Sequence, residues 1–444
     1  MRSDIDKISM RMDVDGLRRG YYADPPYLNI VSILNALAYS RNMTPINALT
    51  GDALSNFDPS NAIVETHWIV RRRPFTVVAG MPRVLAILRE CSGYFHSDSD
   101  EFVNTSGEIQ VEAVDDGTII EYDGNPSDAL PVLVVRGQFK DFALLKTPIL
   151  GTLSRASRIA TNVYHMLDAA KGKPVFFFSA RYDPPEVQAL DGYAYHVAVK
   201  RYNIDTGYSL PDAVSTYANT EWWGGTIEGT ISHEAIACFL GDSVQLMLRF
   251  AEILPPERIR VALVDFNNDC VTETKKVMNA LFERFRLHSE NADPGQAARY
   301  KLHGVRVDTS KELVDKSLSV DASSVDYGVS PRLIKLLRQV INNEWENWGL
   351  PASWHDRARQ WCSDVKIMVS GGFTADKISS FERQHIPVDY YGVGSALLAN
   401  CPENGNLTDY SSVLMKVQVD GYWRAVAKAG RNLNSNPALT QHVF

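Results

Sequence analysis

The segment Lys366-Ile367-Met368-Val369-Ser370-Gly371-Gly372 joins a short apolar run to a polar residue and two glycines. The run is apolar on both faces, which is typical of a strand in a parallel sheet covered by helices. Three more runs have the same form of an apolar strand that ends in a polar residue, at 175–179, 261–265 and 305–308. The pattern predicts strands of one parallel sheet that alternate with helices between residues 137 and 400.

Repeated strand–helix units fit either a doubly wound sheet or a (β/α) barrel. In a barrel, functional side chains gather at the carboxyl ends of the strands, where this chain carries polar residues and glycines. No Gly-x-Gly-x-x-Gly motif opens an early helix, as nucleotide-binding doubly wound sheets require. We therefore predict an α/β fold with an irregular or incomplete (β/α) barrel over residues 137–400.

The two ends of the chain have a different pattern. Residues 1–136 include a strand-like run at 63–70 and the dipeptides Asp116-Gly117 and Asp123-Gly124, which are typical of hairpins. Residues 401–444 return to strand-like alternation, so we expect this segment to pack on the amino-terminal part. The prediction is a flanking α+β domain formed by both chain ends.

Composition limits the function classes. The chain has 444 residues with a formal charge of −8 and is 45% hydrophobic, which excludes general disorder and makes a basic nucleic-acid binder improbable. Its apolar runs are too short to cross a bilayer, and its first residues alternate charges where a signal peptide needs an apolar stretch. The five cysteines are widely spaced, which indicates neither a disulfide framework nor a structural zinc site: Cys91, Cys238, Cys270, Cys362 and Cys401. We expect a cytoplasmic protein that acts on small molecules, without nucleic-acid or membrane partners.

Two glycine-rich segments follow neighbouring predicted strands. Their residues are Ser370, Gly371 and Gly372 in the first, and Gly392, Val393, Gly394 and Ser395 in the second. Each segment opens a predicted helix, where backbone N–H groups and the helix dipole favour an anion. Tight turns between strand and helix would explain either segment alone, but the pair at adjacent strand ends predicts a phosphate cradle.

Four further side chains are candidates for chemistry. Asp265 and Asp308 end neighbouring strands, where they would hold Mg²⁺ or sugar hydroxyls, or simply cap the following loops. Arg181 follows another strand and would clamp a carboxylate or phosphate, or form a surface salt bridge. His233 comes three residues after Thr230 at a predicted helix start, and a lone histidine is more often structural than catalytic.

The order of these motifs resembles that of the nicotinate phosphoribosyltransferase family, in its archaeal-type branch. Gly229-Thr230 with His233 matches a Gly-Thr-x-x-His motif. The other matching segments follow in the family's order: 23–27, 146–151, Ala180-Arg181, 263–265, 305–309, 370–372 and 391–395. Each motif is weak alone, but eight in the right order over nearly the whole chain indicate homology.

Four positions depart from the family pattern. Lys146 stands where the family usually has Glu, Tyr182 where many members have a second Arg, and Asn29 where an Arg is often found. The family's glycine-containing segment is replaced by residues 195–201, which contain no glycine. These departures bear mainly on the identity of the substrate.

The resemblance implies a type II phosphoribosyltransferase. Nicotinate would attack phosphoribosyl pyrophosphate to give nicotinate mononucleotide and pyrophosphate, with Mg²⁺ at Asp265 and Asp308. His233 would be phosphorylated by ATP, and the glycine segments would hold the 5′-phosphate. The family's usual homodimer, with shared active sites, implies that Tyr27 reaches the pyridine ring of a partner copy.

Two alternatives stay open on the sequence. One is a related transferase for another base, such as nicotinamide, quinolinate or an unusual heterocycle, which the changes at Tyr182 and 195–201 keep open. The other is a non-catalytic member that binds phosphoribosyl pyrophosphate, against which the presence of His233 and Asp308 argues.

Overall fold

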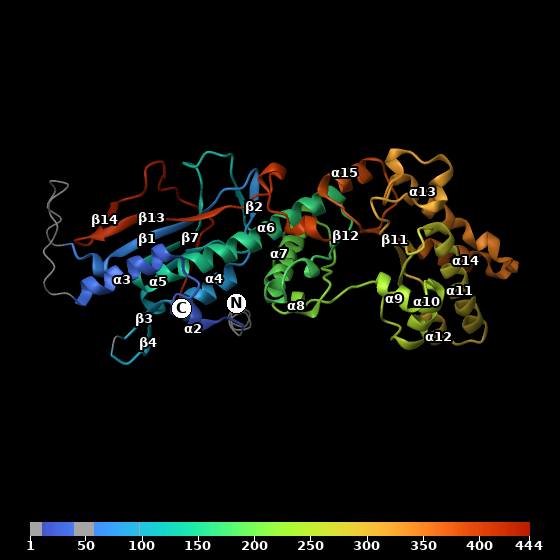
Figure 1. Cartoon of the computed structure of the whole chain (residues 1–444), viewed down its shortest axis with the longest axis horizontal. Helices are drawn as coiled ribbons and strands as arrows, with labels where there is room; N and C mark the ends of the chain where they lie inside the picture. Colours follow the sequence, from blue (N-terminus) through green and yellow to red (C-terminus); the bar gives the residue numbers. More distant parts are fainter. Residues whose placement is uncertain (1–10, 40–56, 97) are drawn as a thin grey trace. The chain divides into compact units, whose positions relative to one another are not determined.

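The computed structural model describes residues 11–39, 57–96 and 98–444 (Figure 1). The chain forms two compact units. Unit 1 comprises Met1–Asn162, Ala189–Arg201 and Ala399–Phe444, and unit 2 comprises Val163–Gln188 and Tyr202–Leu398. The first boundary falls within a continuous helix, α6 (Lys146–Ala170), and not at 136/137 as the sequence suggested, because the first turns of that helix contribute Ile149 and Leu153 to the core of unit 1.

Unit 1 is built on an antiparallel sheet with the strand order β14-β13-β1-β7-β5-β15. The strands are β1 (Ile63–Val70), β5 (Gln110–Ala113), β7 (Pro131–Gln138), β13 (Tyr410–Val419), β14 (Tyr422–Ala425) and β15 (Thr440–His442). The carboxyl-terminal segment supplies three of them, and β13 pairs with β1 along its length, from Val64 opposite Val417 to Val70 opposite Tyr410. Both chain ends therefore build one sheet.

The two Asp-Gly dipeptides do not form the hairpins that they suggested. β5 pairs with β7, and β6 (Ile119–Glu121) pairs with β2 (Phe75–Val77) instead of with its neighbours in sequence. A short hairpin joins β3 (Gly93–Phe95) to β4 (Phe102–Asn104). The antiparallel character of the region is confirmed, but long-range pairing overrides the local turn signals.

Helices cover one face of this sheet and bury its apolar side chains. They are α2 (Val14–Arg18), α3 (Pro25–Tyr39), α4 (Met81–Cys91), α5 (Phe139–Phe142), the first part of α6 and the middle of α7 (Gln188–Thr206). Trp68 on β1, Leu88 on α4 and Leu153 on α6 belong to the shared core and are fully buried. Successive side chains of β1 face the apolar core and polar partners in turn, and this alternation fixes the register of the strand.

Unit 2 contains a parallel sheet with the order β8-β12-β11-β10-β9. The strands are β8 (Val175–Phe177), β9 (Val261–Leu263), β10 (Gly304–Val307), β11 (Lys366–Val369) and β12 (Tyr390–Val393). Successive strands are neighbours and the last returns beside the first, as in a barrel. Single bridges continue from Phe177 to Val214 and from Val214 to Ile227, but no pairing in the described part of the chain joins Ile227 to β9. The parallel α/β sheet is confirmed, whereas a closed barrel is not formed by these pairings.

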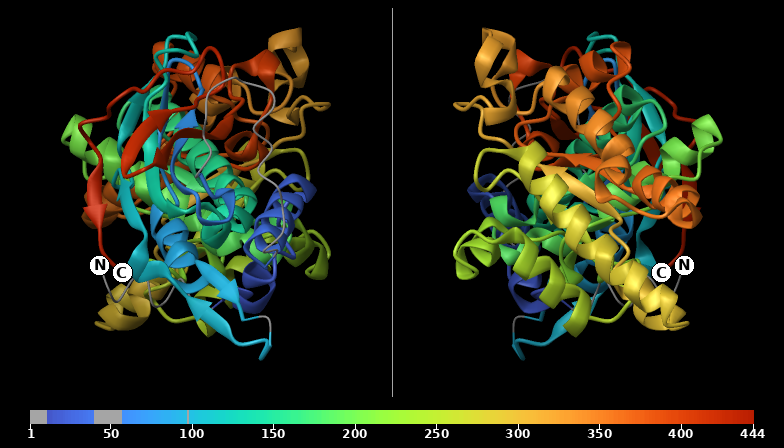
Figure 2. Two further views of the ribbon diagram at one scale, coloured as in Figure 1. Left: turned by 90° about the vertical axis from the view of Figure 1, so that its left-hand side faces the viewer. Right: turned by 90° about the vertical axis from the view of Figure 1, so that its right-hand side faces the viewer.

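Helices separate the strands of unit 2. They are α8 (Tyr217–Thr220), α9 (His233–Cys238), α10 (Ser243–Ile253), α11 (Cys270–Glu290), α12 (Pro294–Arg299), α13 (Pro331–Asn343), α14 (Ala352–Asp364) and α15 (Ala375–Arg383). Helices α11, α13 and α14 pack against one another, as the right-hand view of Figure 2 shows. None of the helices in residues 11–39, 57–96 and 98–444 has the length and apolar character of a transmembrane segment.

A buried carboxylate joins the three central strands of unit 1. Glu65 on β1 lies opposite Arg136 on β7 and Lys416 on β13, and its oxygens lie 2.7 Å from Arg136 Nε and 2.9 Å from Lys416 Nζ. His67 Nε2 lies 3.0 Å from the same carboxylate. Burial opposes ionisation, but these partners outweigh it and hold the pKa of Glu65 well below its usual range.

Replacing Glu65 with Gln removes the buried charge that pairs with Arg136 and Lys416, although Arg136 keeps its ion pair with Glu112. We therefore expect Glu65→Gln to lower the free energy of unfolding at neutral pH by about 3 kcal/mol. Because the folded-state pKa is lowered, the ion pair stabilises the fold above the usual carboxyl pKa of 4.5 and loses this effect as pH falls below it. Urea unfolding at pH 7 and pH 4 measures both effects, with the exposed Glu101→Gln as control. A loss in Glu65→Gln that equals the control at pH 7 would contradict this account.

Candidate functional site

The carboxyl ends of the unit 2 strands surround a cavity of about 560 Å³. Because parallel strands present the same edge, residues far apart in sequence meet here. Most of the side chains and glycines predicted from the sequence line it: Arg181, Thr230, Asp308, Ser370, Gly371, Gly372, Gly392, Gly394 and Ser395. The structure thus brings together both glycine-rich segments, one of the two predicted aspartates and the predicted arginine.

Arg306 on β10 makes hydrogen bonds from all three of its guanidinium nitrogens. Its Nε donates to Ser370 Oγ at 2.8 Å, its Nη1 to Thr230 Oγ1 at 2.8 Å, and its Nη2 to Asp308 Oδ2 at 2.8 Å. The guanidinium also lies 5.3 Å from the centre of the Phe178 ring. Hydrogen bonds from all three guanidinium nitrogens fix Arg306 in position, and the Asp308 carboxylate partly offsets its charge.

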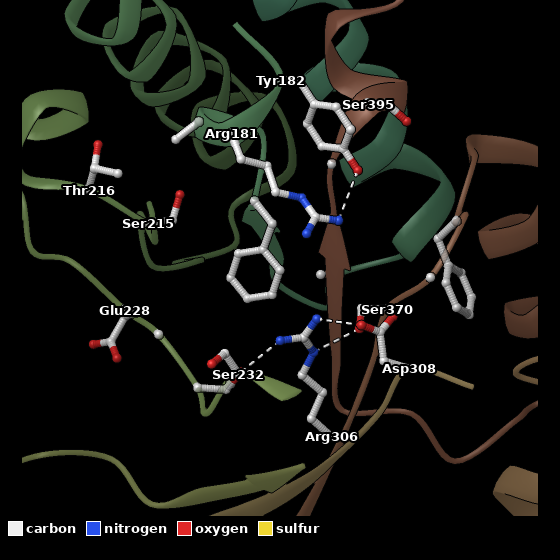
Figure 3. Close-up of a pocket in the computed structure, with 18 of the residues that line it drawn as sticks. Arg181, Tyr182, Ser215, Thr216, Glu228, Ser232, Arg306, Asp308, Ser370 and Ser395 are labelled. Atoms are coloured by element: carbon white, nitrogen blue, oxygen red, sulfur yellow. Dashed lines mark hydrogen bonds and ion pairs between the residues drawn. The ribbon is translucent and has the colours of Figure 1, made fainter. Parts of the chain in front are cut away.

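Arg181 reaches the same space from the other side (Figure 3). It lies in the one-turn 3₁₀ helix Ala180–Tyr182 that follows β8, and its guanidinium lies over the Tyr182 ring, with Nη2 3.4 Å from the Tyr182 hydroxyl. That contact is the first cause of the raised pKa of Arg181. Arg181 is exposed, in contrast to Arg306, so its guanidinium is available to a ligand.

His233 and Asp265 form a pair beside this cavity and not in its lining. His233 is the first residue of α9, which Ser232 caps, and its Nε2 lies 3.0 Å from Asp265 Oδ2. Burial raises the pKa of Asp265, and the contact with His233 opposes this increase. The other oxygen of Asp265 is buried and has no hydrogen-bond partner in the described part of the chain.

The two glycine-rich segments differ in what their glycines do. Gly371 and Gly372 both have positive φ, +85° and +68°, a conformation that side chains rarely adopt. Successive N–H groups in such turns can form a concavity for an anion. Thr374 then caps α15.

Gly392 and Gly394 make room for aromatic rings instead. A Cβ on Gly392 would lie 2.6 Å from the Phe178 ring, and one on Gly394 would lie 2.7 Å from the Tyr182 ring. The helix predicted after Ser395 is only the four-residue 3₁₀ helix Ser395–Leu398. The second segment therefore has a weaker helix N-terminus than its sequence suggested.

Two further predicted residues, besides His233 and Asp265, do not line the cavity. Val393 is buried inside β12, so no side-chain contact with a ligand in this cavity is available to it. Tyr27 lies on α3 of unit 1, where the Lys146 ammonium lies 5.1 Å from its ring centre. The role of Tyr27 towards a pyridine ring stays a prediction.

Sequence reasoning missed Arg306 and Phe178. Arg306 was visible as the one charged residue within the apolar run 305–307, and a charge in a buried strand needs partners. Phe178 carried no such signal, because an aromatic residue at the end of an apolar strand is ordinary core. Its position between Arg306 and Gly392 comes from strand order alone.

The chain is similar to known proteins in sequence and in fold. No family model matches the chain. Nicotinate phosphoribosyltransferase 1 of Arabidopsis thaliana is 29% identical over 148 residues, which cover 33% of this chain and 24% of the plant protein. Nicotinate phosphoribosyltransferase 2 of the same plant is 28% identical over 148 residues, with the same coverage. The chain is related to the nicotinate phosphoribosyltransferases.

A solved structure shares the fold over a longer range than these nicotinate phosphoribosyltransferases match in sequence. The crystal structure of nicotinate-nucleotide pyrophosphorylase from Pyrococcus furiosus superposes with a TM-score of 0.60 at 23% identity. The match covers 95% of this chain and 80% of that chain. The plant proteins match over only a quarter of their length, so the comparisons show a shared fold and a partial similarity in sequence.

The two glycines under aromatic rings give a test of the second segment. Phe178 is half-buried under Arg306, whereas Tyr182 is exposed, so only the Tyr182 ring can swing away. We expect Gly392→Ala to lower the free energy of unfolding by about 1–3 kcal/mol, as overpacking does, and Gly394→Ala to lower it by less than about 1 kcal/mol. Urea unfolding compares the two variants directly. Equal losses would mean that the rings do not set the requirement for glycine.

Proposed function

We propose that this chain transfers the phosphoribosyl group of phosphoribosyl pyrophosphate to nicotinate, giving nicotinate mononucleotide and pyrophosphate, with ATP hydrolysis coupled to the transfer. The supporting observation is the cavity in which the fixed Arg306 and the accessible Arg181 converge beside two glycine-rich turns. A phosphorylated sugar that also carries pyrophosphate needs such separated cationic and N–H donors. The names of the relatives are consistent with this substrate class.

The reaction needs no nucleophilic side chain. The pyridine nitrogen forms a bond to C1 of the ribose while the bond from C1 to the pyrophosphate oxygen breaks, and the bonding pair leaves with pyrophosphate. The protein's contribution is to orient the two substrates and to stabilise charge on the leaving group. Arg306, already fixed by three acceptors, supplies that charge without reorganisation, and the first glycine segment holds the 5′-phosphate.

Mg²⁺ fits Asp265 and Asp308 as part of this proposal. Asp265 keeps one buried oxygen without a hydrogen-bond partner, and Asp308 Oδ1 faces Gly371 across the loop. No group of three or more potential metal-binding side chains occurs within residues 11–39, 57–96 and 98–444. Mg²⁺ is commonly held by one or two carboxylates plus substrate phosphates, where it neutralises phosphate charge, and this pair suits that arrangement.

The role of ATP rests on the resemblance and on the pair of His233 and Asp265. A carboxylate 3.0 Å from Nε2 orients the ring and stabilises a positive charge that develops on it. The homodimer with Tyr27 from a partner copy belongs to the same proposal. Tyr27 on α3 is half-buried, and the Lys146 ammonium lies 5.1 Å from its ring centre.

Removing the imidazole should separate the two reactions. We expect His233→Ala to abolish ATP hydrolysis and to keep weak phosphoribosyl transfer at high substrate, because the displacement itself needs no phosphohistidine. Asp265→Asn keeps the imidazole and should lower ATP hydrolysis less. Release of inorganic phosphate and formation of nucleotide are measured side by side, and wild-type ATP hydrolysis in His233→Ala would reject the role.

The accessible guanidinium should select the charged base. We expect Arg181→Gln to lower kcat/KM for nicotinate by about 10- to 100-fold, since a hydrogen bond to a charged group contributes about 1.5–3 kcal/mol, and to change the value for nicotinamide little. The exposed Arg424→Gln serves as the matched control. Equal losses for both bases would assign Arg181 to phosphate and not to the carboxylate.

Product analysis tests the proposal as a whole. The protein is incubated with phosphoribosyl pyrophosphate, Mg²⁺, ATP and a panel of nicotinate, nicotinamide and quinolinate, and the products are identified by mass spectrometry. Nicotinate mononucleotide as the main product supports the proposal. A different nucleotide as the main product would show that the chain uses another base. The absence of any nucleotide would overturn the proposal of phosphoribosyl transfer.

A further inference from the structure

A second cavity, of about 470 Å³, lies at the opposite, amino-terminal ends of the same strands. Residues from the starts of β9, β10, β11 and β12 line it, and none of the glycine-rich segments does. Phe178, Glu228, Gly229 and Thr230 border both cavities. It is therefore a neighbour of the candidate site but separate from it.

The space is too large to be a packing defect. Inward-facing side chains normally fill the interior of a barrel, and voids in protein interiors rarely exceed the size of a water molecule. Here Gly304 on β10 contributes no side chain, and a Cβ at that position would lie 2.9 Å from the Lys366 carbonyl oxygen of the paired strand. Pairing of β10 with β11 thus requires glycine at residue 304. The volume of the second cavity is in the range of small-molecule binding sites.

Flat rings form one wall. Phe176 on β8 and Tyr390 on β12 stack with their ring centres 5.4 Å apart and their planes at 22°. Met368, which is buried on β11 between β10 and β12, adds a polarizable side chain to the same lining. Such a wall suits a planar aromatic ligand.

The polar side chains of the second cavity determine which hydrogen-bonding groups a ligand must carry. His303 Nδ1 accepts a hydrogen bond from the Arg260 N–H at 3.1 Å, so the neutral ring has its proton on Nε2 and is a donor there. Burial is the main cause of the lowered pKa of His303, which favours the neutral ring. Glu228 supplies a carboxylate that makes no side-chain hydrogen bond to the described residues.

The lysines of this lining are already matched by carboxylates. Lys301 Nζ lies 3.5 Å from Asp364, and Lys366 Nζ lies 3.7 Å from Asp389. A ligand with a net negative charge would therefore meet more negative than free positive charge in this cavity. This excludes nicotinate and other anionic substrates as occupants of the second cavity.

We infer that this cavity is a second binding site for an uncharged, flat heteroaromatic molecule that offers both a hydrogen-bond donor and an acceptor. The inference does not rest on the proposed function, since it uses only the shape and chemistry of the second cavity. An occupant would contact Phe178, whose ring lies beside Arg306, and so would touch the wall of the candidate site.

2-Aminopurine is a suitable probe, because it is flat and uncharged, carries donors and acceptors, and loses fluorescence when it stacks on an aromatic ring. We expect saturable quenching by the wild-type protein. Phe176→Leu should weaken binding by about 5- to 100-fold, as loss of a stacking contact does, and Met368→Trp should abolish it by filling the cavity. Tyr182→Leu is the matched control, because it removes an aromatic ring from the other cavity only.

Each outcome bears on the inference. Unfolding curves establish that the variants fold, and Phe176→Leu carries the test if Met368→Trp does not. No saturable quenching by the wild type would overturn the inference. So would a loss in Tyr182→Leu with no loss in Phe176→Leu, which would place the probe in the candidate site, or equal affinity in all variants, which would indicate non-specific adsorption. Because binding is read without turnover, the result is independent of whether the chain transfers a phosphoribosyl group.

Discussion

The guanidinium of Arg306 is the interaction on which the geometry of unit 2 depends. A partly buried cation is stable when acceptors satisfy it, and here the acceptors come from three separate segments at Thr230, Asp308 and Ser370. Satisfying one charge therefore fixes the loop before α9 and the ends of β10 and β11 relative to one another. The candidate site is largely the space that this arrangement leaves open.

Aromatic rings set the other wall of that space. Phe178 and Tyr182 lie where side chains on Gly392 and Gly394 would otherwise be, so the second glycine-rich segment serves packing as much as it serves an anion. In the first segment the positive φ angles of Gly371 and Gly372 are the reason for glycine. Two similar motifs thus meet different physical requirements.

The inward faces of the parallel strands carry two layers with different properties. Near the carboxyl ends the layer is polar and holds the arginines, Asp308 and the glycine turns. Near the amino-terminal ends it is aromatic and incompletely filled, because Gly304 has no side chain and cannot acquire one beside Lys366. Phe178 and Glu228 lie at the junction, so both cavities share a wall.

The sequence by itself determined the parallel α/β class, the positions of the strands and the polar residues that end them. These are local properties, since an apolar run that ends at a polar or glycine residue is read from a few neighbouring side chains. The order of its motifs also indicated the family, and most of the site residues predicted from the sequence line the cavity. Tertiary structure alone decided the pairing of β6 with β2, the inclusion of both chain ends in one sheet and the open seam after Ile227. It also decided the central place of Arg306, because the partners of a charge that lie 76 and 64 residues away are chosen by strand order, which no local pattern encodes.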